Sequence, residues 1–254
     1  ARMVTGRDRV LVFSGCYHGS VEEAHVELRD GAMVMRNNIH PNGFPHSQLC
    51  NVVEFNDVEA LRRELERGDI ACVLTEPAMT NYGMVVPDPG FHDALRALTR
   101  ATGTLLIIDE THTLSSGIGG YTREHALDPD FFVVGKAIAG GVPAAAFGLS
   151  QATAERVWKV LPRVPPTQRQ SAHAGFGGTL AGNALTLAAM RAVLDQVLTD
   201  AAFQRMIQLS AQLEAGANRA IREAGLSWHA TRIGARAEIL FSPDAPRNAS
   251  EVRR

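Results

Sequence analysis

Short apolar runs alternate with helical periodicities through the first two thirds of the chain, and this alternation constrains the fold more than any other feature. The apolar runs are 10–13, 70–74, 105–108 and 131–134. Between them, 57–67 and 91–102 place leucines at helical spacing, and each of these two segments is followed by a glycine. Continuously apolar strands are buried on both faces, so we expect an α/β fold with a mostly parallel sheet covered by helices.

Composition and charge exclude several classes of protein. The 254 residues are 45% hydrophobic and 20% charged, with a net charge of −2, which gives no reason to expect nucleic acid or an anionic membrane as partner. The three cysteines are scattered and lack metal-type spacing, which fits a reducing cytoplasm. The nine histidines form no metal-binding motif. One stretch, 131–149, resembles a membrane span, but it contains Lys136 and Pro143, so we predict two buried strands and a loop.

The last third of the chain changes in character. A long Ala/Leu helix is predicted over 180–198, a second helix over 201–224, and a strand over 237–241. We therefore expect a large domain over 1–199 and a smaller α+β domain that begins at 200 and runs to 254. The chain has no initiator Met and stops soon after its last predicted strand, so we expect both domains to be incomplete parts of a longer protein.

Polar side chains follow several of the predicted strands. Glu76 and Asp109 come just after two of them, about one strand–helix–strand unit apart, and Tyr17-His18 follows the first strand. Ligands bind beyond the carboxyl ends of parallel strands, so we expect these side chains to face one crevice. The ring of Tyr17 could stack there on a flat ligand, although Tyr-His pairs often only close loops.

Lys136 is one of two lysines in a chain with 23 arginines. Lysine can lose its proton and act as a nucleophile, whereas arginine stays charged. The apolar runs 131–134 and 142–146 flank Lys136, so we expect partial desolvation, which favours the neutral amine. A lysine amine and the carboxylate of Asp109 are the two groups that a pyridoxal-phosphate enzyme must supply. The alternative is a surface lysine in a turn.

Two other motifs have more than one interpretation. An apolar strand ending in Asp109-Glu110 also occurs in ATPases, but that reading requires a Gly-Lys-Ser/Thr loop, and Gly135-Lys136 is followed by Ala137. Gly177-Gly178-Thr179 precedes the predicted helix at 180, where a hydroxyl and free amides could bind an anion. Thr179 could equally be a plain helix cap.

Together these motifs carry a family resemblance. Five strings occur in the family's order: Gly15-Cys16-Tyr17-His18-Gly19, Glu76-Pro77 with Asn81 and Gly83, Asp109-Glu110, Gly135-Lys136 with Gly140-Gly141-Val142-Pro143, and Gly178-Thr179-Leu180-Ala181-Gly182-Asn183. The chain resembles the class III pyridoxal-phosphate aminotransferases, and within them the glutamate-1-semialdehyde aminomutase-like group. The resemblance implies fold type I and a homodimer with a shared active site.

The resemblance also implies roles for the residues that carry the chemistry. Lys136 would form a Schiff base with pyridoxal 5'-phosphate and later move the proton at the substrate's α-carbon. Asp109 would pair with the ring nitrogen. Tyr17 would stack on one face of the ring with His18 beside it.

The remaining implied contacts surround the ring and the phosphate. Thr111 and His112 would approach the second face of the ring, and Asn81 would hydrogen-bond its phenolic oxygen. Thr179 would reach across a dimer interface to the neighbouring subunit's cofactor phosphate.

The chain departs from the family in two places. It lacks the Ser/Gly-Thr-Glu-Ala-type phosphate loop that precedes the Tyr-His-Gly motif, and it reads Thr111-His112-Thr113-Leu114 where the family commonly has Val, a variable residue, Thr and Gly. The second change concerns the substrate pocket and leaves the cofactor chemistry intact. We expect an aminotransferase acting on an amino compound and an oxo acid or aldehyde. The alternatives are an intramolecular aminomutase and a cofactor-free partner subunit.

Overall fold

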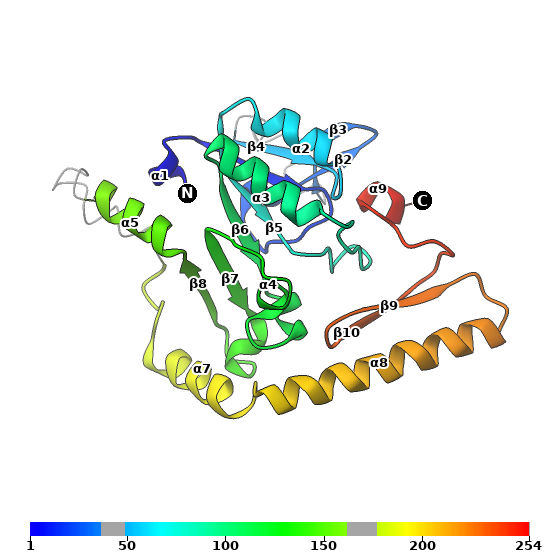
Figure 1. Cartoon of the computed structure of the whole chain (residues 1–254). Helices are drawn as coiled ribbons and strands as arrows, with labels where there is room; N and C mark the ends of the chain where they lie inside the picture. The colour runs from blue at the N-terminus through cyan, green and yellow to red at the C-terminus, as the bar shows by residue number, and fades with distance from the viewer. Residues whose placement is uncertain (37–48, 162–176, 254) are drawn as a thin grey trace.

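The computed structural model describes residues 1–36, 49–161 and 177–253, and its centre is a six-stranded sheet (Figure 1). In spatial order the strands are β4 (Cys50–Val53), β1 (Arg9–Phe13), β5 (Ile70–Thr75), β6 (Leu105–Asp109), β7 (Phe131–Gly135) and β8 (Ala145–Leu149). Neighbouring strands are parallel except β7 and β8, which are antiparallel. The predicted α/β fold with a mostly parallel sheet is confirmed.

Helices flank the sheet and continue into the C-terminal part of the chain (Figure 1). The α-helices are α1 (Arg2–Thr5), α2 (Val58–Leu65), α3 (Phe91–Thr102), α4 (Gly120–Glu124), α5 (Gln151–Val160), α7 (Ala184–Gln196), α8 (Asp200–Glu223) and α9 (Ala249–Val252). The 3-10 helices within the described residues include η1 (Glu22–Ala24), η4 (Thr113–Ser116) and η5 (Lys136–Ala139). The predicted bounds of α3 agree with the structure at both ends, because Gly90 and Gly103 flank it in left-handed conformations.

Strand β1 shows why its sequence is continuously apolar. Leu11 and Phe13 belong to the core shared with α2 and α3, whereas Val12 points to the opposite face, where it packs in a second cluster with Val26. The opposite face is covered by η1 and by a hairpin of two strands, β2 (Val26–Arg29) and β3 (Ala32–Met35). Because side chains alternate along a strand, a strand covered on both faces needs apolar residues at successive positions.

Three phenylalanines organise the core between the sheet and the two helices. Phe13 of β1, Phe55 after β4 and Phe91 at the start of α3 are all buried, with ring centroids 4.7–5.5 Å apart. Tilted and edge-on contacts at this spacing add to the stabilisation from buried apolar area. They fix α3 against β1 and so help to position the strand ends that form the site.

Two predicted elements differ from the structure. The helix predicted from Leu180 begins at Ala184, because the Asn183 side chain caps it by accepting a hydrogen bond from the Thr186 amide at 3.0 Å. Thr179 therefore neither caps this helix nor lies at its N-terminus. The two strands predicted to be buried, β7 and β8, are largely half-buried or exposed within the part of the chain that the structure describes.

The C-terminal part consists of α8, a hairpin and α9. The hairpin joins β9 (His229–Ile233), which was not predicted, to β10 (Arg236–Leu240). It packs on α8, where the Asn218 amide both donates to and accepts from the backbone of Ala230 at 3.0 and 2.9 Å. Arg236 donates to the carbonyl oxygen of Thr80 at 2.6 Å, so the hairpin also contacts the loop after β5.

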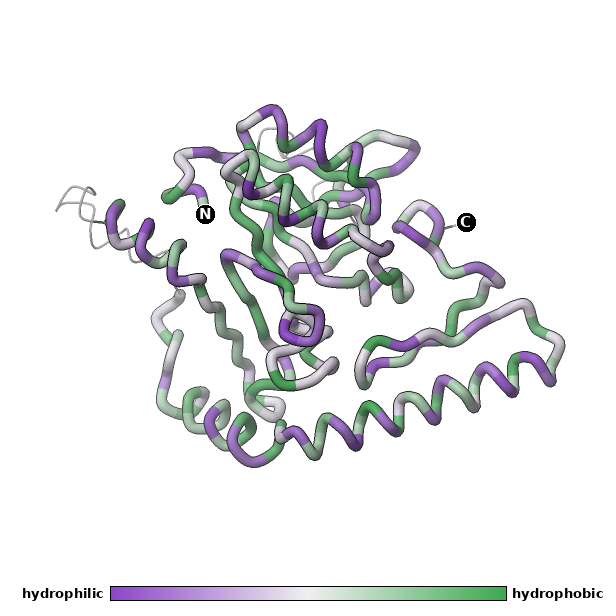
Figure 2. Tube along the Cα trace, in the orientation of Figure 1, coloured by the Kyte–Doolittle hydropathy of each residue, from purple (hydrophilic) through white to green (hydrophobic). Residues whose placement is uncertain are grey.

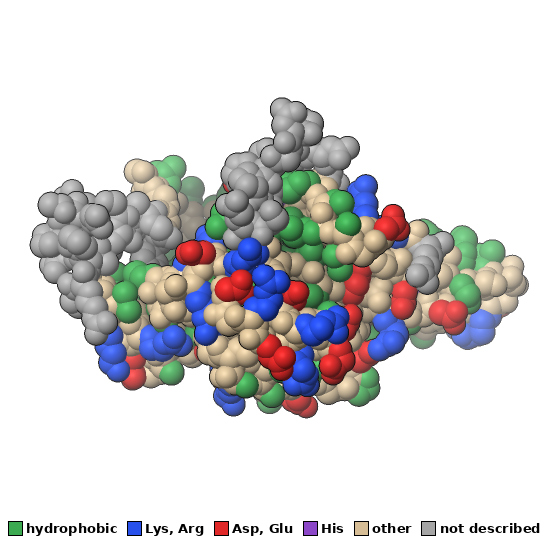
Figure 3. Space-filling model, turned by 90° about the horizontal axis from the view of Figure 1, so that it is seen from above, with side chains coloured by type: hydrophobic (Ala, Val, Ile, Leu, Met, Phe, Trp, Pro, Cys, Tyr) green, Lys and Arg blue, Asp and Glu red, His purple; other side chains and the backbone are tan. Residues whose placement is uncertain are grey.

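The surface mixes charges of both signs. The face seen in Figure 3 carries acidic and basic side chains side by side, in keeping with the net charge of −2. Figure 2 shows the apolar strands at the centre and amphipathic helices around them. Helix α7 differs, because Leu185, Leu187 and Leu194 are all exposed. Among the described residues, no helix is both long and apolar enough to cross a bilayer.

Candidate active site

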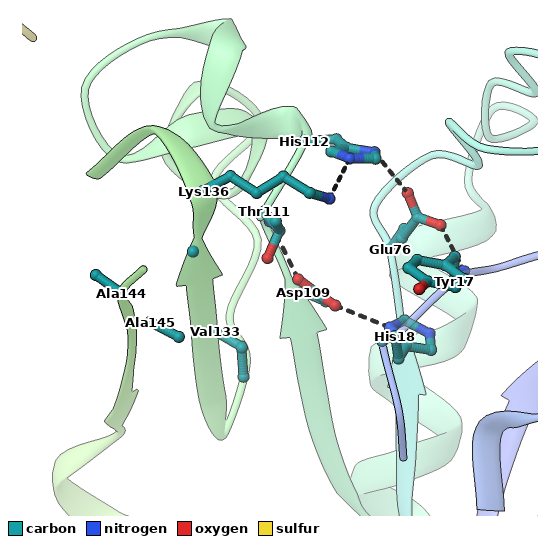
Figure 4. Close-up of a pocket in the computed structure, with 12 residues that line it drawn as sticks. Tyr17, His18, Glu76, Asp109, Thr111, His112, Val133, Lys136, Ala144 and Ala145 are labelled. Atoms are coloured by element: carbon teal, nitrogen blue, oxygen red, sulfur yellow. Dashed lines mark hydrogen bonds and ion pairs between the residues drawn. The ribbon is translucent and has the colours of Figure 1, made fainter. Parts of the chain in front are cut away.

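A pocket of about 400 Å³ opens at the carboxyl ends of β1, β5, β6 and β7. Its wall on the β7 and β8 side is small and apolar, formed by Val133, Gly135 and Ala144–Ala145. The aromatic and ionisable side chains that line it are Tyr17, His18, Glu76, Asp109, His112 and Lys136 (Figure 4). Strand-end residues from four separate strands thus meet in one crevice, as predicted for Glu76 and Asp109.

Asp109, the last residue of β6, presents a carboxylate to the pocket. Its Oδ2 lies 2.9 Å from Nδ1 of His18, and its Oδ1 accepts a hydrogen bond from the Thr111 amide at 3.1 Å. Burial would raise the pKa of Asp109, but the hydrogen bond and charge of His18, together with Thr111, outweigh burial and hold the pKa below its ordinary value. The carboxylate is therefore ionised at neutral pH.

Lys136 is the first residue of η5 and adopts a left-handed backbone conformation, with φ of 52°. For a residue with a Cβ this conformation costs about 1–3 kcal/mol, and such residues concentrate at functional sites. The side chain points toward His112, whose Nε2 lies 2.5 Å from Nζ (Figure 4). Lys136 is exposed and lines the pocket, so the predicted partial desolvation is wrong for the part of the chain that the structure describes.

His112 and Glu76 lie beside Lys136 in a hydrogen-bonded group. His112 Nδ1 lies 2.6 Å from Thr80 Oγ1, and this oxygen lies 2.5 Å from Oε2 of Glu76. Burial, followed by the charges of Lys136 and Arg236, lowers the pKa of His112 to about 4, so the imidazole is neutral at pH 7. Burial raises the pKa of Glu76, and the hydrogen bond from Thr80 partly offsets the increase.

Tyr17 lies at the rim of the pocket. Its side chain is 44% exposed, and its amide donates to Oε1 of Glu76 at 2.9 Å. His18 reaches from the same segment to Asp109, and its Nε2 is buried with no hydrogen-bond partner among the described residues. Tyr17 is thus accessible at the pocket, and His18 has a ring nitrogen without a hydrogen-bond partner among the described residues.

Of the remaining predicted residues, one lines the pocket and two lie outside its lining. Thr111 lines the pocket beside Asp109. Asn81 is exposed outside the lining residues, and its side-chain nitrogen lies 3.2 Å from Nδ1 of His112. Thr179 is also exposed and does not line this pocket. Asn81 therefore contacts the pocket residues through His112. Within the described part of the chain, no hydrogen bond joins Thr179 to a residue that lines this pocket.

Thr80 was not predicted from the sequence, and Glu110 was named only as part of the Asp109-Glu110 motif, without a role. Thr80 connects His112 to Glu76, and its only signal is its place four residues after Glu76 in a post-strand loop. Glu110 is fully buried and accepts hydrogen bonds from the Thr113 hydroxyl and the Thr122 amide at 2.6 and 2.5 Å. It anchors the segment that follows Thr111 and His112, a role that the Asp109-Glu110 motif does not reveal.

Comparison with known proteins gives a consistent result. The model of the family described as aminotransferase class-III matches residues 1–225. Glutamate-1-semialdehyde 2,1-aminomutase of Thermomicrobium roseum is 35% identical over 100% of this chain and 57% of that protein. The enzyme of the same name from Desulfitobacterium hafniense is 34% identical over 95% of this chain and 55% of that protein. The chain thus spans little more than half the length of these relatives.

Solved structures share the fold. A glutamate-1-semialdehyde-aminomutase from Pseudomonas aeruginosa PAO1 is 57% identical with a TM-score of 0.93, covering 99% of this chain and 55% of that one. A variant of that enzyme in which a lysine is replaced by alanine was solved in complex with PMP. An omega-transaminase from Sphaerobacter thermophilus is 33% identical with a TM-score of 0.80, covering 99% of this chain and 57% of that one.

Proposed function

The chain belongs to the class-III aminotransferase family, and from this premise we propose that the whole protein is a pyridoxal-phosphate-dependent aminotransferase. It would move an amino group between an amino compound and an oxo acid or aldehyde. The proposal depends chiefly on one observation: the Lys136 amine and the ionised Asp109 carboxylate line the same pocket.

The residues present fit the cofactor. An ionised carboxylate suits a protonated ring nitrogen, a primary amine suits an aldehyde, and the half-exposed ring of Tyr17 suits a flat aromatic partner. The buried Nε2 of His18, unpartnered among the described residues, adds a polar atom free to meet a ligand. When bound, pyridoxal phosphate supplies an aldehyde that condenses with amines and a ring that accepts electrons from the substrate's α-carbon.

Lys136 and Asp109 would be the catalytic residues. The Lys136 amine would hold the cofactor and, once free, carry the proton at the substrate's α-carbon, since it is a primary amine in the pocket. Asp109 would keep the proton on the ring nitrogen, because His18 and Thr111 stabilise its ionised form.

The other contacts are proposed from the family motifs. Tyr17 would stack on one face of the ring with His18 beside it, and Thr111 and His112 would lie toward the other face. Asn81 would hydrogen-bond the phenolic oxygen; its exposed amide, 3.2 Å from His112, lies close enough to the lining residues to support this assignment.

A reduction experiment tests the proposal. The purified protein is incubated with pyridoxal phosphate, reduced with borohydride and digested, and the labelled peptide is mapped. We expect label on Lys136. Lys159 is an internal control, because it is exposed on α5, away from the pocket lining. Label on Lys159 alone, or no label on folded protein, contradicts the proposal and favours the cofactor-free partner subunit.

A second function, the intramolecular aminomutase, is favoured by one observation. The Pseudomonas aeruginosa structure, 57% identical, is described as a glutamate-1-semialdehyde-aminomutase. The two functions differ in their need for an external acceptor. Amination of an added 2-oxo acid by the cofactor-loaded protein supports transfer between molecules, whereas conversion of a single substrate without an acceptor supports the aminomutase.

We propose in addition that the protein is a cytoplasmic homodimer with a shared active site. The exposed leucines of α7 and the exposed, pocket-remote position of Thr179 support a contact in which Thr179 reaches the partner's cofactor phosphate. The three cysteines are free and buried, which suits a reducing compartment. The partners would be a small-molecule amino donor and oxo acceptor.

A further inference from the structure

Four side chains form a continuous hydrogen-bonded row along the wall of the pocket, from the exposed Lys136 to the buried Glu76. Lys136 Nζ lies 2.5 Å from His112 Nε2, His112 Nδ1 lies 2.6 Å from Thr80 Oγ1, and this hydroxyl lies 2.5 Å from Glu76 Oε2. Thr80 and Glu76 are 1% and 3% exposed. The row thus connects an exposed amine to a carboxylate shielded from bulk water, and Figure 4 shows its members Lys136, His112 and Glu76.

The inner end of the row is held in one orientation. The Tyr17 amide donates to Oε1 of Glu76, which leaves Oε2 to face Thr80. The carbonyl oxygen of Thr80 accepts a hydrogen bond from Arg236 at 2.6 Å, which fixes the loop that carries the hydroxyl. Both contacts keep the Thr80 hydroxyl between His112 and Glu76.

The row has two complete hydrogen-bonding arrangements. With Glu76 ionised, the Thr80 hydroxyl donates to Glu76, His112 donates from Nδ1 to Thr80, and Nε2 accepts from Lys136. With Glu76 protonated, every donor reverses: Glu76 donates to Thr80, Thr80 donates to Nδ1, and Nε2–H donates to a neutral Lys136 amine. The imidazole is neutral in both, and only the nitrogen that carries its hydrogen changes.

We propose that His112, Thr80 and Glu76 form a proton relay for Lys136, an inference that rests on the proposed function of Lys136 as a proton carrier. The Lys136 ammonium gives one proton to Nε2, Nδ1 gives its proton to Thr80 Oγ1, and the Thr80 hydroxyl gives its proton to Glu76 Oε2. The result is a neutral lysine amine, a neutral histidine of the other tautomer and a protonated glutamate. Reversal returns the proton, so no group outside the row is consumed.

Lowered basicity of the imidazole and raised basicity of the carboxylate both suit such a relay. Burial and neighbouring cations lower the pKa of His112 to about 4, so the ring passes a proton on rather than storing it. Burial raises the pKa of Glu76, which brings its proton-bound form closer to neutral pH. The other titratable or charged groups that act on the row are Cys16, His18, Asp109 and Arg236.

The relay depends on residues that only this arrangement brings together. His112 follows β6, Lys136 follows β7, and Thr80 and Glu76 follow β5, so three strand ends contribute. A bound substrate would cover the pocket and separate the Lys136 amine from bulk water. The Lys136 amine could then exchange its proton through His112, Thr80 and Glu76 rather than with water in the pocket.

Nuclear magnetic resonance of the cofactor-free protein tests the coupling, with ¹⁵N-labelled histidine reporting which nitrogen of His112 is protonated. In the native protein, with Glu76 ionised, we expect the Nδ1–H tautomer, because the Thr80 hydroxyl donates to Glu76 and accepts from Nδ1. In Glu76→Gln, the Tyr17 amide holds the new carbonyl oxygen, so the amide NH₂ faces Thr80 and donates. We expect His112 to remain the Nε2–H tautomer at every pH above 5.

Thr80 variants supply a matched pair, and the tautomer of the native protein is a test even if Glu76→Gln does not fold. Thr80→Ser keeps the hydroxyl and should retain the tautomer difference between native Glu76 and Glu76→Gln. Thr80→Val keeps the shape and removes the hydroxyl, so His112 should no longer respond to Glu76→Gln. An Nε2–H tautomer in the native protein, or a tautomer difference that persists in Thr80→Val, overturns the relay.

Competitive acylation of the same cofactor-free protein gives an independent measurement. In Glu76→Gln the Nε2–H of His112 points at Lys136 and disfavours its ammonium form. Lys136 should therefore be acylated roughly tenfold faster than in the native protein at neutral pH, which is about the effect of one hydrogen bond to a charged group. Lys159 should label at the same rate in both proteins. Equal labelling of Lys136 in both proteins counts against the relay.

The two proposals fail separately. Borohydride labelling by pyridoxal phosphate reports whether Lys136 binds the cofactor, and it does not depend on Thr80. Label on Lys136 with no tautomer change would retain the proposed function and discard the relay. A tautomer change without label on Lys136 would support the coupled hydrogen bonds, but it would contradict the proposed function and with it the relay's role in catalysis.

Discussion

Replacing His112 by Gln should make the protein less sensitive to acid. In the unfolded chain a histidine has a pKa near 6.5, whereas burial and the charges of Lys136 and Arg236 lower the folded pKa of His112 to about 4. The unfolded state therefore binds a proton that the folded state excludes. The stability that comes from neutral His112 is fully present above pH 6.5 and is lost as pH falls from 6.5 to about 4.

The magnitude follows from the difference in pKa. A difference of about 2.5 corresponds to about 3.4 kcal/mol at 1.36 kcal/mol for each unit of pKa, as an upper limit reached below pH 4. Between pH 6.5 and 5 the limit is about 2 kcal/mol. The ring of His112 is only partly buried and solvent screens its neighbours, so we halve this figure to about 1 kcal/mol.

Urea unfolding of the cofactor-free protein at pH 7 and pH 5 measures the effect. The native protein should lose about 1 kcal/mol more unfolding free energy between these pH values than His112→Gln, because all other titrating groups are shared. If both proteins lose the same free energy, the imidazole is not held neutral by its neighbours, and the electrostatic description of this site is wrong.

Four further changes test the rest of the site and the core. Lys136→Ala should abolish turnover and cofactor attachment, measured by amino-group transfer and by borohydride labelling. Asp109→Asn should lower turnover by roughly 10²–10⁴-fold, because the amide cannot hold a proton on the ring nitrogen, with the fold unchanged by circular dichroism. Phe91→Ala should lower the unfolding free energy by about 3–5 kcal/mol in urea, since it removes a buried ring that contacts two others. Thr179→Ala should speed loss of cofactor, measured by dialysis and absorbance, and mixed dimers with Lys136→Ala should recover part of the activity.

Each of these expectations can be refuted. Near-normal turnover of Lys136→Ala would exclude the lysine as the cofactor's attachment point. A mild effect of Asp109→Asn would mean that another group protonates the ring. Loss of less than about 1 kcal/mol in Phe91→Ala would show that the aromatic core tolerates a cavity there. If mixed Thr179→Ala and Lys136→Ala dimers recover no activity, then Thr179 does not reach the partner's cofactor.

Several features of the fold follow from local patterns. The apolar runs placed β1, β5, β6 and β7 within one or two residues, and the glycines on either side of α3 defined its ends. These patterns are local because a strand buried on both faces, or a helix that ends at a left-handed glycine, has a signature within a few residues. Strands β2, β3, β4 and β9 were missed, because short strands that depend on packing partners have no such signature.

The sequence by itself indicated the two side chains on which the proposed function rests, Asp109 and Lys136, and both line the pocket. Asp109 ends a continuously apolar strand, and Lys136 is a rare lysine beside a glycine, so each carries its signal in its neighbours. The tertiary structure alone decided how those residues are connected. His112, Thr80 and Glu76 lie in the loops after two different strands, and Lys136 comes from a third. Hydrogen bonds act over about 3 Å, and no spacing along the chain encodes a distance that is set by how β5, β6 and β7 align in the sheet.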